Sequence, residues 1–140
     1  MGKRRRARES AIQCLYQWDM TGADPEQVLQ GYWESQGDVD ADLKRFAESL
    51  VLGTVAHADE IDAMISEQSR HWRIDRLGLV EKSILRLGGY ELIYEDETPA
   101  AVVIDEAVEL SKRFADPAAG PFINGVLDGM SKRVEAEADS

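Results

Sequence analysis

Apolar residues recur along this chain at intervals of three and four, which is the spacing that places side chains on one face of an α-helix. The first such stripe runs through Ala7, Ala11, Leu15 and Trp18. It predicts a helix over about 4–20. No segment of strand length alternates apolar and polar positions, and no hairpin turn separates two such segments. The pattern therefore predicts an all-α fold.

Turn and capping residues divide the pattern that follows the first helix. Gly22 is placed to end that helix, because glycine is common just beyond a helix C-terminus. Asp24 and Pro25 then form an N-cap followed by a proline at the first helical position. They predict a short second helix, which Gly37 ends.

The middle of the chain has a long helical pattern over about 40–70, with Phe46 among its inward-facing apolar positions. This stretch is either one long helix or two helices with a break near 57–59. Asp75 can cap a further helix that runs to about Tyr94.

The last third of the chain repeats the same signals. Thr98 and Pro99 again pair a capping residue with proline and predict another helix. The composition of 116–121 predicts a loop. A final helix is expected to begin near Phe122 and to fray into the acidic tail 135–140.

The composition agrees with one compact domain. The chain has 140 residues, of which 44% are hydrophobic and 31% charged, a balance typical of globular proteins. We expect a compact bundle of about six to seven helices in a single domain, 1–140. Apolar runs are too short to span a bilayer, and the N-terminus lacks the apolar segment of a secretory signal. The single cysteine, Cys14, lies among apolar neighbours, which predicts a core position and fits the reducing cytoplasm.

Charge is distributed unevenly along the chain. Residues 1–8 contain five cationic side chains and no acidic one, although the whole chain has a formal net charge of −11. An acidic body repels polyanions at long range. Contact with a nucleic acid should therefore be local and should involve the basic segment 1–8.

No catalytic or metal-binding pattern stands out. His57 and His71 are fourteen residues apart, and neither has the partner at i+4 that a helical zinc site uses. We expect both at or near the surface, with His71 packing beside Trp72. Phosphate-binding, dinucleotide-binding and serine-hydrolase motifs are absent from the sequence. The sequence predicts neither an enzyme nor a cofactor.

The basic segment is the most informative feature. Its arginines spread around about one helical turn, and each planar guanidinium can bond two phosphate oxygens. Gln13 and Tyr16 lie further along the same predicted helix and offer an amide and an aromatic ring to unstacked bases. The residues alone leave three interpretations open: RNA binding, a solubilising disordered tail, or contact with a membrane or an acidic protein.

Four segments resemble the NusB family of bacterial transcription antitermination factors. They are RRRARESAIQCLYQWD (4–19), VEKSILRLGGYEL (80–92), AVVIDEAVELSKRF (101–114) and FINGVLDGM (122–130). The resemblance implies a compact all-helical fold without catalytic activity. It also implies binding to the single-stranded boxA element of nascent transcripts together with ribosomal protein S10, also called NusE. That pair joins an antitermination complex on RNA polymerase, notably on ribosomal RNA operons.

The resemblance also implies a set of RNA-binding residues from several helices. They are Arg4, Arg5, Arg6, Arg8, Gln13, Tyr16, Arg86, Phe114, Phe122 and Asn124. Glu81 matches a position on the S10-facing side. For four of these residues a structural role stays open. Phe122 can be a core residue at a helix start, Tyr16 can be largely buried, Glu81 can be a solvated helix residue, and Asn124 can bond its own helix.

One position departs from the family pattern. Family members commonly have a lysine directly before the F-[VI]-N-G-V-L-D segment, where this chain has Pro121. The change removes a charge and a backbone donor from the expected RNA-binding face. It puts in doubt how much the C-terminal part contributes to RNA affinity.

Two other functions are compatible with the sequence. NusB-like domains also precede the catalytic part of some RNA methyltransferases, so the chain could be an accessory domain for such an enzyme. It could also form a homodimer whose interface covers the arginines.

Overall fold

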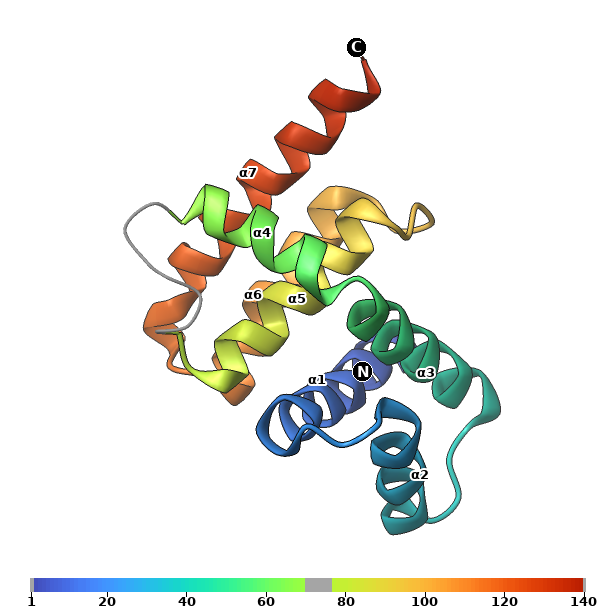
Figure 1. Cartoon of the computed structure of the whole chain (residues 1–140). Coiled ribbons are helices and arrows are strands. Elements are labelled where there is room, and N and C mark those ends of the chain that lie inside the picture. Colours follow the sequence, from blue (N-terminus) through green and yellow to red (C-terminus); the bar gives the residue numbers. More distant parts are fainter. Residues whose placement is uncertain (1, 70–76, 140) are drawn as a thin grey trace. The chain divides into compact units, whose positions relative to one another are not determined.

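The chain is described by a computed structural model that covers residues 2–69 and 77–139. These residues form seven α-helices and one short 3-10 helix, and no β-strand occurs among them. The helices divide into two compact units, Met1–Ala56 and His57–Ser140 (Figure 1). The predicted all-α class and helix number are confirmed. The single domain expected from the sequence stays a prediction, and each unit is described by itself.

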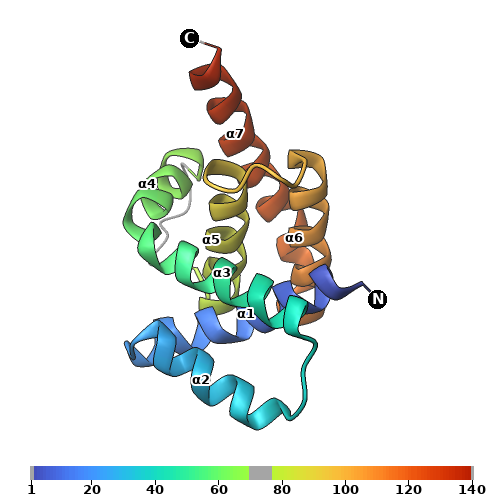
Figure 2. The ribbon, with the colours of Figure 1, turned by 90° about the vertical axis from the view of Figure 1, so that its right-hand side faces the viewer.

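The first unit consists of α1 (Lys3–Thr21), α2 (Pro25–Gln36) and α3 (Ala41–Ala56). α1 packs most extensively against α3, and α2 contacts both (Figure 2). Three alanines, Ala7 and Ala11 of α1 and Ala47 of α3, are fully buried. Because an alanine side chain is only a methyl group, helices that meet through alanines can approach closely.

The ends of α1 and α2 are those predicted from the sequence. Gly22 adopts a left-handed conformation with φ of 71°, and its N–H donates to Trp18 O at the end of α1. The Asp24 carboxylate caps α2 by accepting from the N–H of Glu26 at 2.8 Å. Gly37, with φ of 73°, ends α2. The capping signals in the sequence therefore located all three helix ends: the end of α1 and both ends of α2.

Cys14 lies in the core of the first unit, as predicted. Its side chain is 1% exposed. Burial, and to a lesser degree the negative charge of Glu48, raises the pKa of the Cys14 thiol to about 12. The thiol therefore stays protonated at neutral pH, which is typical of a structural cysteine and not of a nucleophile.

The second unit consists of α4 (Ala58–Gln68), α5 (Leu79–Ile93), α6 (Ala100–Phe114), the 3-10 helix η2 (Pro117–Ala119) and α7 (Gly120–Ala138). α5 packs against α4, α6 and α7 and lies between α4 and α6 in Figure 2. The two-helix interpretation of the middle segment is confirmed. α3 ends at Ala56 and α4 begins at Ala58, with the partly exposed His57 between them.

Two predictions for the second unit are wrong. Pro99 itself, not Thr98, is the N-cap of α6. The segment 116–121 is not a loop, because Asp116 caps η2 by accepting from the N–H of Ala118, and α7 begins directly afterwards. A proline is tolerated near a helix start, because the N–H that it lacks would have no intrahelical partner at that position.

The acidic tail is also more regular than predicted. α7 continues to Ala138, so most of the tail is helical. Alanine and glutamate favour helices, and Arg133 pairs with both Glu137 on the same helix and Glu67 on α4. The predicted cap at Asp75 and the two residues His71 and Trp72 lie outside the described residues.

The pair Gly88 and Gly89 allows α5 to approach its neighbours closely. A Cβ atom on Gly88 would lie 2.9 Å from a methyl group of Leu127 on α7. A Cβ atom on Gly89 would lie 2.9 Å from atoms of both Ile61 and Met130. Carbon atoms pack at ~3.5–4.0 Å, so neither position has room for a side chain.

No helix among residues 2–69 and 77–139 combines the length and the apolar character needed to cross a membrane.

We predict that Gly89→Ala destabilises the protein by about 1–3 kcal/mol, because the new methyl group overpacks a filled core. The methyl group of Ile61 cannot turn away, since β-branched side chains are stiff in helices. The measurement is urea unfolding followed by circular dichroism. Gly31→Ala is the matched control, because a Cβ there meets nothing within 4 Å. We expect the control to stabilise α2 by roughly 0.5–1 kcal/mol. Equal stability of the two variants would contradict the role given to Gly89.

Candidate nucleic-acid interface

The predicted basic segment is helical and differs in exposure from one residue to the next. Arg4 and Arg6 are exposed on the first turns of α1, and Arg5 is partly exposed. Arg8 is only 3% exposed. The helix therefore carries two exposed arginines, and the disordered tail considered from the sequence does not describe this segment.

Phe46 of α3 holds the arginine side chains on this surface. The guanidinium carbon of Arg4 lies 4.2 Å from the centre of the Phe46 ring, and that of Arg8 lies 5.5 Å from it. A cation above an aromatic face is attracted by the ring quadrupole. The apolar pattern predicted an inward-facing position for Phe46, and its contact with the arginines depends on the packing of α1 on α3.

Lys3 is engaged by acidic side chains. Its ammonium lies 3.0 Å from a carboxylate oxygen of Asp40, and the hydrogen bond from Lys3 lowers the pKa of the Asp40 carboxyl. Asp42 lies 4.0 Å from the same ammonium. The positive charge of Lys3 is therefore partly neutralised, and the net positive field of the segment comes from its arginines.

Gln13 and Arg6 line the same hollow of about 310 Å³, in a lining that also includes Ser10 and Tyr32. Gln13 is exposed, and its amide donates to Glu9 O at 3.4 Å. The Tyr32 hydroxyl donates to Ser10 Oγ at 3.0 Å and links α2 to α1. Tyr16 is half-buried, so part of its ring remains accessible.

In the second unit, Arg86 takes part in a structural ion pair. Its Nε and Nη2 donate to the two carboxylate oxygens of Asp62 at 2.8 and 2.9 Å. Only 9% of Arg86 is exposed, and the pair joins α5 to α4. The bidentate geometry is the strong form of a charged hydrogen bond. The predicted RNA contact of Arg86 stays a prediction.

Glu81 and Phe122 line another hollow of about 310 Å³, between the start of α5 and the start of α7, together with Leu77 and Asp116. Both are partly exposed, which matches neither a fully buried core residue nor a freely solvated one.

Phe114 and Asn124 are the other two predicted contacts in this unit. Phe114 is half-buried at the end of α6, with the guanidinium of Arg113 5.5 Å from its ring centre. Asn124 is exposed on α7. Among these residues of the second unit, the structure brings Glu81 and Phe122 to a common hollow.

The second unit also contains an aromatic stack that the sequence did not reveal. The rings of His57 and Tyr94 lie 3.8 Å apart and nearly parallel, and Tyr90 stacks beside them. The Tyr94 hydroxyl donates to Glu60, which raises the pKa of Tyr94 to about 12 and lowers the pKa of the Glu60 carboxyl. Tyr90 and Tyr94 are four residues apart on a helix, a spacing that could have indicated their contact.

Among the described residues, no group of three or more histidine, cysteine, aspartate or glutamate side chains is arranged to hold a metal ion.

Comparison with known proteins decides the family. The family model described as the NusB family matches residues 5–132 of this chain. The chain belongs to the NusB family. The match covers α1 from Arg5 onward and, apart from Arg4, all four segments that resemble the family.

Individual relatives are similar over nearly the whole chain. The transcription antitermination protein NusB of Myxococcus xanthus is 43% identical over 131 residues, which is 91% of this chain and 94% of the relative. That of Bacillus velezensis is 40% identical over 134 residues, covering 96% and 99%. A solved structure of the antitermination factors NusB and NusE in complex with dsRNA has a chain that matches with a TM-score of 0.85 and 38% identity, over 95% of this chain and 98% of that one.

We predict that Arg86→Met lowers the free energy of unfolding by about 1.5–3 kcal/mol, because it leaves the Asp62 carboxylate without its bidentate partner. Chemical denaturation provides the measurement. The control is Arg6→Ala, at an exposed position, which should change stability by less than about 0.5 kcal/mol. An unchanged denaturation midpoint for Arg86→Met would show that this pair does not hold α5 to α4.

Proposed function

We propose that this chain is a transcription antitermination factor that binds a boxA-type single-stranded RNA together with a NusE (S10) protein. The observation that carries the proposal is the pair of exposed guanidiniums, Arg4 and Arg6, on α1 of a NusB-family chain. The sequence comparison supports the antitermination role, since relatives with about this chain's length carry that name.

The direct RNA contacts are assigned first to exposed side chains. Arg4 and Arg6 bind backbone phosphates, and Gln13 and Asn124 offer amides to bases or sugars. Tyr16, Phe114 and Phe122 are partly exposed and serve as stacking partners. Arg5 is a further phosphate contact. Arg8 and Arg86 stay predicted contacts that require their nearly buried guanidiniums to move.

A second protein accounts for the strength of binding. A few phosphate contacts on a chain with a net charge of −11 give only modest RNA affinity. If NusE binds both the chain and the same RNA, the second contact becomes intramolecular and the affinities reinforce each other. Glu81, in the hollow with Phe122, is the proposed NusE-facing residue. The resulting complex acts on RNA polymerase, hence in the cytoplasm, and the proposal assigns no catalytic step.

The salt dependence of RNA binding tests the phosphate contacts. With NusE present, about five neutralised phosphates give a slope of log affinity against log salt of about −3.5, so a fourfold rise in salt weakens binding roughly a hundredfold. The double variant Arg4→Ala/Arg6→Ala should bind more weakly, with a slope smaller in magnitude by about 1.4. Fluorescence anisotropy of a labelled boxA oligonucleotide measures both quantities.

The matched control for this measurement removes two positive charges elsewhere. Arg45 and Lys132 are exposed and pair with Asp42 and Asp128 on their own helices. The double variant Arg45→Ala/Lys132→Ala should keep the wild-type slope. A slope that changes equally in both double variants would show that only net charge matters. A duplex of the same sequence should compete less well than the single strand.

Partner dependence separates the antitermination role from the methyltransferase-accessory alternative. We expect purified S10 to raise the affinity for boxA RNA at least tenfold, because both proteins share one RNA. Glu81→Lys should reduce this increase while leaving the binding of RNA alone unchanged. Gel shifts with and without S10 provide the measurement. Sedimentation of the chain with and without RNA tests the homodimer, which RNA should dissociate if its interface covers the arginines. No enhancement by S10 would contradict the proposed function.

A further inference from the structure

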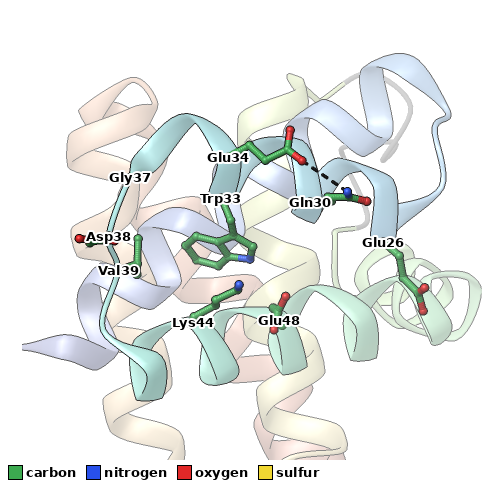
Figure 3. A pocket seen from close by; sticks show the side chains of 9 residues that line it. All are labelled: Glu26, Gln30, Trp33, Glu34, Gly37, Asp38, Val39, Lys44 and Glu48. Carbon is green, nitrogen blue, oxygen red and sulfur yellow. Dashed lines mark hydrogen bonds between the residues drawn. The ribbon is translucent and has the colours of Figure 1, made fainter.

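A second hollow in the first unit is lined by none of the predicted RNA-binding residues, although it shares Trp33, Asp38 and Val39 with the hollow that Arg6 and Gln13 line. It has a volume of about 530 Å³ and is framed by α2, α3 and the segment 37–39 that follows α2 (Figure 3). This volume falls within the range of ~300–1,000 Å³ that is usual for ligand pockets. None of the arginines of α1 lines it.

An unsatisfied donor forms part of its wall. Trp33 is 8% exposed, and its Nε1–H has no hydrogen-bond acceptor among the described residues. Figure 3 shows the indole extending from α2 toward α3, with its nitrogen on the side where Lys44 and Glu48 rise from α3. Buried N–H groups without an acceptor are rare in folded proteins. The nitrogen is itself covered, so a carbonyl oxygen that entered the hollow would supply the missing acceptor once the side chains over the indole move aside.

The charges of the lining select the chemistry of the occupant. Four carboxylates line the hollow, and Lys44 is the single cation among its nine lining residues. The acids are Glu26, Glu34, Asp38 and Glu48. Such a lining repels phosphate and attracts cations. The Trp33 ring reinforces this preference, because the Lys44 ammonium already lies 5.9 Å from its centre and shows that a cation is accommodated there.

One hydrogen bond and one backbone turn shape the opening of the hollow. The Gln30 amide donates to Glu34 Oε1 at 3.4 Å, which orients this carboxylate beside the hollow (Figure 3). Gly37, in its left-handed conformation, turns the chain so that Asp38 and Val39 close one end. The occupant must therefore offer a cation to the rim and a carbonyl to the buried indole.

We propose that this hollow binds a lysine- or arginine-containing segment of a partner protein. A main-chain carbonyl of that segment accepts from Trp33 Nε1–H, and its cationic side chain lies among the carboxylates of the lining. Lysine and arginine residues in a peptide carry both groups within one residue, joined by a flexible stem, whereas RNA carries the wrong charge. The proposal goes beyond the RNA-binding function and does not rest on it.

The test uses the full chain and a blocked pentapeptide, acetyl-Gly-Arg-Ala-Arg-Gly-amide. Its control is the same peptide with citrulline in place of arginine, which keeps the carbonyls and the shape but loses the charge. Nitrogen-15 NMR follows the indole N–H signal of Trp33, assigned by its absence in Trp33→Phe. We expect the arginine peptide to shift this signal in a saturable way and the citrulline peptide to bind at least tenfold more weakly.

Paired variants distinguish the hollow from the general negative charge of the protein. Glu34→Gln/Glu48→Gln should weaken peptide binding at least fivefold. Asp105→Asn/Glu135→Gln removes two exposed acids of the second unit and should change it less than twofold. Equal losses in the two variants would overturn the proposal. So would a Trp33 signal that the peptide leaves unmoved. The peptide titrations contain no RNA, so their outcome is independent of whether RNA binds at Arg4 and Arg6.

Discussion

Close approach between helices, through residues with little or no side chain, is the constraint on which both units depend. In the first unit Ala7 and Ala11 of α1 and Ala47 of α3 are fully buried, and these two helices pack extensively against each other. In the second unit Gly88 and Gly89 leave no room for a Cβ between α5 and its neighbours. Larger residues at these positions would separate the helices and expose the apolar side chains around them.

The candidate RNA surface follows from this constraint. Because α1 lies close to α3, the ring of Phe46 lies within 4.2 Å of the Arg4 guanidinium carbon. An arginine supported in this way loses less side-chain entropy when it meets a phosphate than one on a mobile tail. The same three helices also carry an acidic hollow around Trp33. This hollow shares Trp33, Asp38 and Val39 with the hollow that contains Arg6. One small unit thus carries adjoining surfaces of opposite charge.

Local features of the sequence predicted most of the helices, because capping residues and apolar periodicity act over one or two turns. Asp24 and Gly37 marked both ends of α2, and Gly22 marked the end of α1. The prediction of a loop at 116–121 was wrong, because composition was used where the capping geometry of Asp116 decides the structure. The prediction that the tail frays was wrong, because Arg133 forms ion pairs with Glu67 and Glu137.

Site residues were harder to predict than helices, since exposure depends on packing between distant segments. Sequence alone treated Arg4 and Arg8 as equivalent, yet the second is 3% exposed. It did not reveal the partner of Arg86, because Asp62 lies on another helix, twenty-four residues earlier. The hollow beside Trp33 carries no motif, and its only signals in the sequence are an aromatic residue and scattered acids.

The burial of Cys14 has a practical consequence for spectroscopy. It is the only cysteine in the sequence, and its thiol is both covered and protonated. Maleimide dyes and spin labels react with accessible thiolates. A cysteine introduced at a chosen surface position of the native chain would therefore accept a probe selectively, without prior removal of Cys14. Distances between the two helical units could then be measured in solution on an otherwise unaltered core.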